Sequence, residues 1–102
     1  DSGKTYLVHC SVARTINLPA AAKGASYKFI VTDSTAASTI NAESGVMYGL
    51  FTDDNDTTAV SGTTTINIGT SAAAGDWLSL VSDGTNWYVS GQCQHASAGF
   101  TV

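Results

Sequence analysis

Two cysteines and two histidines are the side chains in this sequence with the most distinctive chemistry. His9 and Cys10 are adjacent near the start, and Cys93 and His95 lie near the end. Together they would supply two thiolates and two imidazoles, which is an acceptable tetrahedral zinc set. However, adjacent side chains point to opposite faces of a strand, so His9 and Cys10 cannot grip one ion without a bulge. The set also lacks the closely spaced Cys-x-x-Cys pairs typical of zinc sites, so we expect no metal here.

The two cysteines are also a candidate disulfide. A Cys10–Cys93 bond would join the first expected strand to the last part of the chain and close a long loop. In the chain-entropy model such a bond stabilises the fold by about 4 kcal/mol. The alternative is a pair of reduced thiols, because a buried cysteine packs as a small hydrophobic residue. The choice depends on the redox compartment, which the residues themselves do not reveal.

Four consecutive polar residues, Asp53-Asp54-Asn55-Asp56, offer oxygen ligands of the kind that calcium binds. An EF-hand loop would need glycine at the sixth position from Asp53 and a bidentate glutamate at the twelfth. The twelfth position is Thr64, and the sixth is not glycine. We therefore interpret residues 53–56 as a solvated turn.

Catalytic groups are scarce in this chain. A nucleophilic serine, cysteine or threonine needs a neighbouring base, and His9 and His95 are the only conventional bases. No spacing among the many hydroxyl residues singles out a nucleophile. Glu43 is the only glutamate, which gives little support to a carboxylate pair for glycoside cleavage. We expect a protein that is not an enzyme and that carries no cofactor.

The segment from residue 75 to residue 91 carries the most informative local pattern. Two amphipathic runs flank Asp83-Gly84, and this dipeptide tolerates the positive φ angles that a two-residue hairpin turn requires. With the turn centred there, one face of the ribbon is wholly apolar and the other is mixed, and a one-residue slip would destroy that separation. The predicted cross-strand pairs are Leu80 with Trp87, Leu78 with Val89, Ser79 with Tyr88, and Trp77 with Ser90.

Trp77 and Tyr88 fall on the mixed face of this hairpin, opposite Leu78 and Leu80. Exposed aromatic pairs mark contact surfaces, so this pair is the candidate contact surface for a sugar or a protein neighbour. The alternative is a second core layer, because both faces of a ribbon can be covered in a sandwich.

The remaining elements are also strands. Alternation with a period of two recurs along the chain, and turn residues separate the runs. Residues 20–24 are too few for a stable helix and serve as a connector, while Asp33-Ser34 begins a turn. We predict an all-β protein with one domain over residues 1–102, an antiparallel β-sandwich or a β-roll or barrel with a C-terminal hairpin. Besides the hairpin, the expected strands are 5–10, 12–18, 27–31, 38–41, 46–51, 63–68 and 100–102.

Composition limits the partners. The chain has 102 residues and 10.4 kDa, and charged residues make up 12% of it, against about 25% in an average soluble domain. The net charge of −4 gives no attraction for a phosphate backbone or an anionic bilayer, so we expect neither nucleic acid nor membrane as a partner. A surface with few charges can be buried against a neighbouring protein at a small desolvation cost.

Four segments carry a recognisable family pattern, namely GKTYLV (residues 3–8), TINLPAA (15–21), YKFIV (27–31) and GDWLSLVSDGTNWYV (75–89). They resemble small β modules of tailed-bacteriophage virion proteins. The resemblance spans much of the chain, and the hairpin is its most specific part, whereas residues 42–62 match nothing recognisable. Such modules occur in head decoration (cement) proteins and in tail-fibre or spike proteins, and no catalytic motif accompanies them.

The resemblance implies a structural protein on the outer surface of a phage capsid. Its expected partners are the major capsid protein and copies of itself in a homotrimer, and repeated weak contacts would add up by avidity. Assembly in the reducing host cytoplasm would favour reduced thiols at Cys10 and Cys93. The alternative is a tail-fibre or spike domain that contacts a host glycan or protein through Trp77, Tyr88 and residues 53–56. A third interpretation is a bacterial surface or secreted carbohydrate-binding module.

Overall fold

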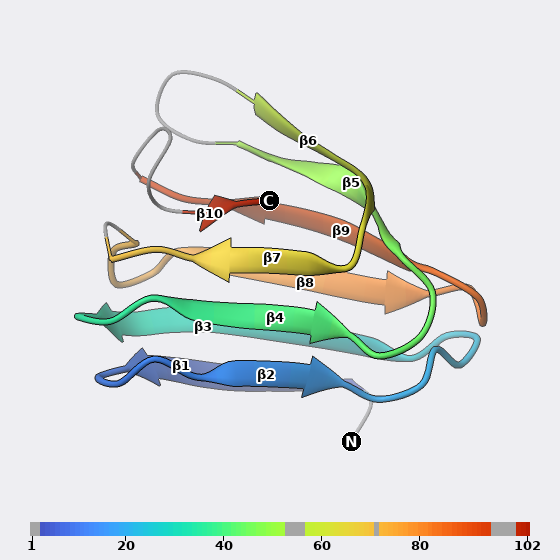
Figure 1. Cartoon of the computed structure of the whole chain (residues 1–102), viewed down its shortest axis with the longest axis horizontal. Coiled ribbons are helices and arrows are strands. Elements are labelled where there is room, and N and C mark those ends of the chain that lie inside the picture. The colour runs from blue at the N-terminus through green and yellow to red at the C-terminus, as the bar shows by residue number, and fades with distance from the viewer. Residues whose placement is uncertain (1–2, 53–56, 71, 95–99) are drawn as a thin grey trace.

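The computed structural model describes residues 3–52, 57–70, 72–94 and 100–102, apart from the side chains of Cys10, Ser34 and Thr58. Strands account for all the regular structure in these ranges, and none of the described residues forms a helix that could cross a membrane. The strands are β1 (Lys4–Cys10), β2 (Thr15–Leu18), β3 (Ser26–Ser34), β4 (Ser38–Ala42), β5 (Met47–Thr52), β6 (Thr57–Thr63), β7 (Thr65–Ile68), β8 (Trp77–Ser82), β9 (Trp87–Gln92) and β10 (Phe100–Thr101) (Figure 1).

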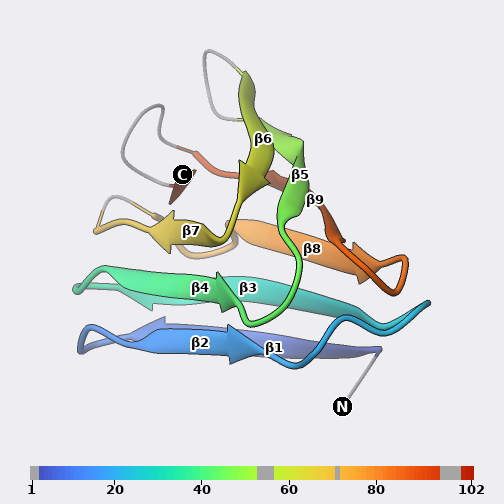
Figure 2. The same ribbon diagram turned by 45° about the vertical axis from the view of Figure 1, so that its right-hand side comes forward.

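The strands form two sheets that pack face to face. The larger has six strands in the order β1-β3-β8-β9-β5-β6, and the smaller has four in the order β10-β7-β4-β2. Figures 1 and 2 show the two layers from two directions, with the smaller sheet in front. The prediction of an all-β sandwich is confirmed.

The expectation that the sheets are antiparallel is wrong for three neighbouring pairs. β1 pairs with β3, β2 with β4, and β5 with β9, all in parallel. The first four strands alternate between the two sheets, so β2 of the other layer connects β1 to β3. Strands joined by such a crossover run in the same direction, whereas strands joined by a tight turn run in opposite directions.

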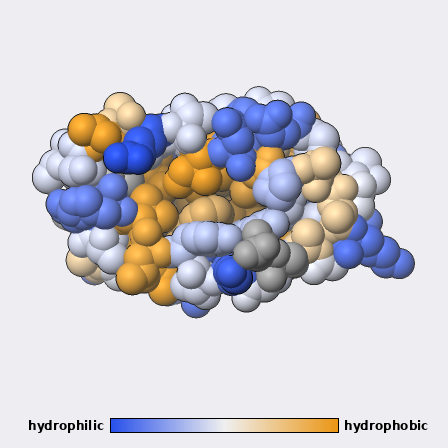
Figure 3. All heavy atoms as spheres, turned by 90° about the horizontal axis from the view of Figure 1, so that it is seen from below, coloured by the Kyte–Doolittle hydropathy of each residue, from blue (hydrophilic) through white to orange (hydrophobic). Residues whose placement is uncertain are grey.

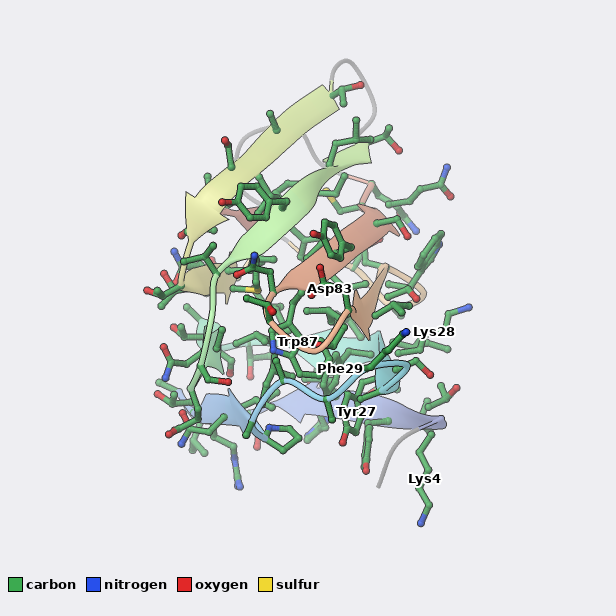
Figure 4. The ribbon with its side chains drawn as sticks, turned by 90° about the vertical axis from the view of Figure 1, so that its right-hand side faces the viewer. Lys4, Tyr27, Lys28, Phe29, Asp83 and Trp87 are labelled. Carbon is green, nitrogen blue, oxygen red and sulfur yellow. The ribbon has the colours of Figure 1, made fainter. Side chains whose placement is uncertain are left out.

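The core lies between the sheets and takes alternate residues from each strand. Strand β9 shows the pattern clearly, because Trp87 and Val89 are buried while Tyr88 and Ser90 are exposed. Figure 4 shows the labelled Tyr27, Phe29 and Trp87 between the sheets, and the rings of Tyr27 and Trp87 are 5.8 Å apart. Each fully buried large side chain contributes about 1.5–3 kcal/mol of hydrophobic stabilisation. The fully buried set includes Leu18, Ile40, Met47, Phe51, Ile66, Ile68, Leu78, Leu80 and Trp87.

The hairpin of β8 and β9 exists, but its predicted register is wrong by two residues. Ser82 pairs with Trp87 and closes a loop over residues 83–86, instead of a two-residue turn at Asp83-Gly84. The carboxylate of Asp83 accepts hydrogen bonds from the N–H groups of Thr85 and Asn86, at 2.9 and 2.8 Å. These bonds stabilise the wider loop. A slip of two residues preserves the two faces, so the predicted separation of apolar and mixed sides is correct.

Other elements differ in extent from the predictions. Strand β6 was not predicted, although it pairs antiparallel with β5 over most of its length. Strand β2 begins at Thr15 instead of Val12, and β3 continues through the expected turn at residues 33–34 because β1 pairs with it there. The expected polar turn at residues 53–56 lies outside the described residues.

Candidate functional site

The surface of the six-stranded sheet that faces away from the four-stranded sheet is the candidate site, and we call it the outer face. Its side chains are those that alternate with the buried residues of β3, β8, β9 and β5. Tyr88 is 46% exposed and Leu50 is 48% exposed, so no other described element covers this face. Its apolar and aromatic members are Ile30, Tyr48, Leu50, Trp77, Val81 and Tyr88.

Tyr88 lies in the middle of the densest part of this face. It is opposite Val81 of β8 on one side and Tyr48 of β5 on the other. The rings of Tyr48 and Tyr88 are stacked, with centroids 6.2 Å apart and an interplanar angle of 27°. The Tyr88 hydroxyl donates a hydrogen bond to Oδ2 of Asp83 at 3.0 Å, which holds the ring in place.

The pKa values of both Asp83 and Tyr88 are shifted from their ordinary values. Hydrogen bonds from the N–H groups of Asn86 and Thr85 lower the pKa of Asp83 below its ordinary value. The hydrogen bond to Asp83, and then the charge of Asp83, raise the pKa of Tyr88. At neutral pH the site therefore presents a charged carboxylate and a protonated phenol beside two stacked rings.

Trp77 and Tyr88 share the outer face, as predicted, but they do not form one site. Trp77 is opposite Gln92, whereas Tyr88 is opposite Val81, four residues further along β8. This separation is about 13 Å at the usual rise per residue. The predicted proximity of the two rings was wrong because it rested on the slipped register. Trp77 instead contacts Lys28, whose Nζ lies 4.9 Å from the ring centroid on the outer side of the sheet (Figure 4).

Four apolar or aromatic side chains of the outer face, namely Ile30, Tyr48, Leu50 and Val81, were not singled out in the sequence. The alternation within 77–82 did place Val81 on the mixed face, but the parallel pairing of β5 with β9 could not be foreseen. That pairing brings Tyr48 and Leu50 beside Tyr88 and Ser90. The sequence predicted a strand at residues 46–51 but did not indicate which strand pairs with it.

The chemically distinctive residues remain apart. Nδ1 of His9 lies 3.7 Å from Oδ2 of Asp33, where β1 pairs with β3, and both side chains are largely exposed. His95 lies outside the described residues. In the described part of the chain, no group of three or more histidine, cysteine or acidic side chains could hold a metal ion.

The candidate Cys10–Cys93 disulfide and its alternative, two reduced thiols, both stay hypotheses, because the side chain of Cys10 is not among those described. Cys93 is buried just after β9, and Cys10 ends β1. Two strands, β3 and β8, lie between β1 and β9 in the sheet order. Three strand spacings amount to about 14 Å, whereas the Cα atoms of a disulfide lie within about 7 Å. The topology therefore places the two cysteines on strands that are not neighbours in the sheet.

A pocket of about 260 Å³ is lined by residues that include Asp76 and Cys93. Asp76 is buried, but its two carboxylate oxygens accept the N–H groups of Ala73 and Gln94, at 2.8 and 3.1 Å. These bonds connect the loop before β8 to the segment after β9. Asp76 therefore stabilises the fold through these two hydrogen bonds.

The opposite surface, on the four-stranded sheet, has a different character. Three Thr-Ile-Asn repeats occupy β2, β4 and β7, and their isoleucines point toward the core. The outward residues form cross-strand hydrogen bonds, from Thr39 Oγ1 to Asn67 Oδ1 at 3.1 Å and from Asn41 Nδ2 to Asn17 Oδ1 at 3.2 Å. We call this the Thr/Asn face, and it consists of Thr15, Asn17, Thr39, Asn41, Thr65 and Asn67.

Comparisons of this chain with protein-family models, with curated proteins and with solved structures found no match. The functional argument therefore starts from the surfaces described above.

Proposed function

We propose that this protein is a non-catalytic structural component of a virion, a decoration (cement) subunit on the outer surface of a bacteriophage capsid. The outer face of the six-stranded sheet is the observation that carries the proposal. It combines exposed aromatic and aliphatic side chains with hydroxyl and amide groups, and its charged groups include Lys28 and the Asp83 carboxylate beside Tyr88. The sequence resemblance to phage virion modules supports the same context.

The physical properties of this face suit adhesion to a protein shell. Few charges need to be dehydrated on contact, and charged groups are the most costly to bury. A sheet surface held by a sandwich core is rigid, so little conformational entropy is lost when it binds. A homotrimer would place three such faces against neighbouring major capsid proteins, and its avidity would exceed the affinity of a single face. Binding only to the assembled shell would stabilise that shell by mass action.

A co-sedimentation experiment tests this proposal. Purified protein is mixed with expanded heads, stripped of their decoration subunits, from the phage that encodes the chain. We expect the wild-type protein to pellet with the heads and to raise the temperature at which they open. In the same assay Leu50→Lys should bind at least tenfold more weakly, because it places an unpaired charge in the contact.

The matched control is Thr15→Lys, which adds the same charge on the Thr/Asn face. It should bind as the wild type does. No co-sedimentation of the wild-type protein, or equal losses from both variants, would contradict the proposal. Sedimentation of the free protein should also give three times the 10.4 kDa mass of the chain if it is a homotrimer.

One observation favours a second candidate function, a tail-fibre or spike domain that binds a host glycan. Sugar-binding surfaces combine aromatic rings with polar groups that fix orientation, and Tyr48, Tyr88 and Asp83 form such a set. If this function holds, Tyr88→Ala should abolish binding to host cells while the protein stays folded. Under this second function, neither the wild-type protein nor any variant should bind to the stripped heads. Trp77→Ala tests the more distant ring separately.

A further inference from the structure

A groove of about 680 Å³ runs along one side of the sandwich, between β1 and β2. These strands lie at the end of the six-stranded sheet and at the end of the four-stranded sheet. Figures 1 and 2 show them one behind the other at the lower side of the molecule. Seen from below in Figure 3, this side is hollowed and apolar side chains gather in the hollow.

The floor of the groove belongs to the hydrophobic core. Tyr27 and Phe29 of β3 and Leu18 of β2 line it and are buried. Tyr6 of β1 covers part of this floor, with its ring stacked on Phe29 at 5.7 Å. Val8, the next inward residue of β1, also lines the groove and is buried, whereas Leu7 between them pairs with Ile30 on the opposite side of the sheet. An apolar surface of this kind favours a covering segment with apolar side chains.

The strands beside the groove favour an extended occupant. β1 spans seven residues and is the terminal strand of its sheet. The outer edge of a terminal strand presents N–H and C=O groups that can pair with an added strand. A peptide lying along β1 would extend the six-stranded sheet and direct every second side chain into the groove.

Charge identifies the chemistry of that occupant. Arg14 lines the groove and is exposed. Within the described residues, no carboxylate lies within ion-pair distance of its guanidinium, whereas His9, on the same rim, faces Asp33. An arginine with no ion-pair partner beside an apolar groove favours a carboxylate on the incoming segment. A second copy of this chain is less suitable, because each copy carries a net charge of −4.

We propose that the groove binds an extended segment of a partner protein by strand addition to β1. Alternate apolar side chains of this segment fill the groove, and one aspartate or glutamate pairs with Arg14. The site is distinct from the outer face, and the inference does not depend on the proposed capsid function.

Selection from a displayed library of random heptapeptides, with the full chain as bait, tests the chemistry. We expect the enriched peptides to alternate apolar and polar residues and to share one acidic residue. With Arg14→Glu as bait, the acidic residue should be replaced by lysine or arginine. Lys23→Glu makes the same change of net charge outside the residues that line the groove, so its selected peptides should match those of the wild type.

One enriched acidic peptide then tests the location. The dissociation constant of this peptide should rise at least tenfold for Arg14→Glu and change less than twofold for Lys23→Glu. A peptide with proline in place of its central residue should not bind. Bound peptide should slow amide exchange along β1. Peptides without an alternating pattern, selection that ignores the charge at position 14, or protection confined to β5 and β6 would overturn the proposal. So would a dimer that forms through β1 in the absence of peptide.

Discussion

The carboxylate of Asp83 connects the hairpin loop to the outer face. It accepts the N–H groups of Thr85 and Asn86 and the hydroxyl of Tyr88. The first two bonds stabilise the loop, and the third orients the central ring of the candidate site. A single exposed side chain therefore contributes both to local structure and to the proposed contact, and its ionisation provides a test of each.

The first prediction concerns the stability of the loop as a function of pH. Because hydrogen bonds from Asn86 and Thr85 lower the pKa of Asp83 from 3.8, the charged carboxylate stabilises the folded state above that value. This contribution is lost as the pH falls through the lower pKa of the folded state. We expect Asp83→Ala to reduce the Tm at neutral pH, and the difference from wild type to shrink in acid below pH 3.8.

Thermal unfolding followed by circular dichroism over a pH series makes this measurement. Glu43→Ala removes a carboxylate from an exposed bend and serves as the control, with little change expected. A difference between Asp83→Ala and wild type that stays constant into strong acid would mean that the charge of Asp83 does not stabilise the loop.

The second prediction concerns the Tyr88 phenol. Its pKa is raised from 10.0 because Asp83 accepts its hydrogen bond and because the charge of Asp83 opposes a phenolate. Asp83→Asn removes that charge, so the pKa of Tyr88 should move back toward 10.0. Ring resonances of Tyr88 in an NMR titration report the pKa directly. Asp33→Asn is the control, and the pKa of Tyr88 in this variant should equal that of the wild type. An unchanged pKa of Tyr88 in Asp83→Asn would disprove the coupling.

At the scale of elements, β5 is the strand that makes the outer face continuous. It pairs in parallel with β9 and antiparallel with β6, so it has a neighbour on each side. Gly49, in its middle, has a φ of +139°, and a Cβ atom there would collide with the carbonyl oxygen of Val89. Gly62 occupies a bulge in β6 with a φ of +72°, and no atom lies within 4 Å of its potential Cβ. The two glycines are therefore needed for different reasons.

The third prediction separates these two reasons. Gly62→Ala should cost about 1–2 kcal/mol, the usual penalty for an L residue in left-handed backbone. Gly49→Ala should cost about 3 kcal/mol or more, because the strands must also move apart. Denaturant unfolding gives both values. Equal losses would show that the close approach of β5 and β9 does not constrain position 49.

At the scale of the whole molecule, one core joins two sheets with different outer surfaces. Ile40 of the four-stranded sheet and Trp87 of the six-stranded sheet are both fully buried in that core. The Thr/Asn face lies on one side, the apolar outer face on the other, and the groove lies at one edge. The molecule therefore presents three surfaces that differ in chemistry.

The fourth prediction tests this single core. Ile40→Ala should lower the free energy of unfolding by about 2–5 kcal/mol, as core truncations do. Tryptophan fluorescence, which reports on the six-stranded sheet, should show the same shift of midpoint as circular dichroism. Thr15→Ala, on the Thr/Asn face, is the control and should have little effect. Two separate transitions in Ile40→Ala would mean that the sheets unfold independently.

The sequence by itself determined the fold class, most of the strands and the sidedness of the hairpin. These properties depend on alternation with a period of two, which is local and appears directly in residues such as 77–82 and 87–91. It also placed Trp77 and Tyr88 on the same face. Strand β6 was missed because Thr57–Thr63 is rich in threonine, serine and glycine, and only pairing with β5 makes it a strand.

Only the tertiary structure decided which strands are neighbours. Parallel pairing of β1 with β3 and of β5 with β9 joins segments that are far apart in the chain, and no local pattern specifies such a pairing. The stacked Tyr48 and Tyr88 and the groove between β1 and β2 both result from it. The hairpin register also required the structure, because a shift of two residues leaves every side chain on the same face. In the observed register, the hydrogen bonds of Asp83 stabilise the loop over residues 83–86.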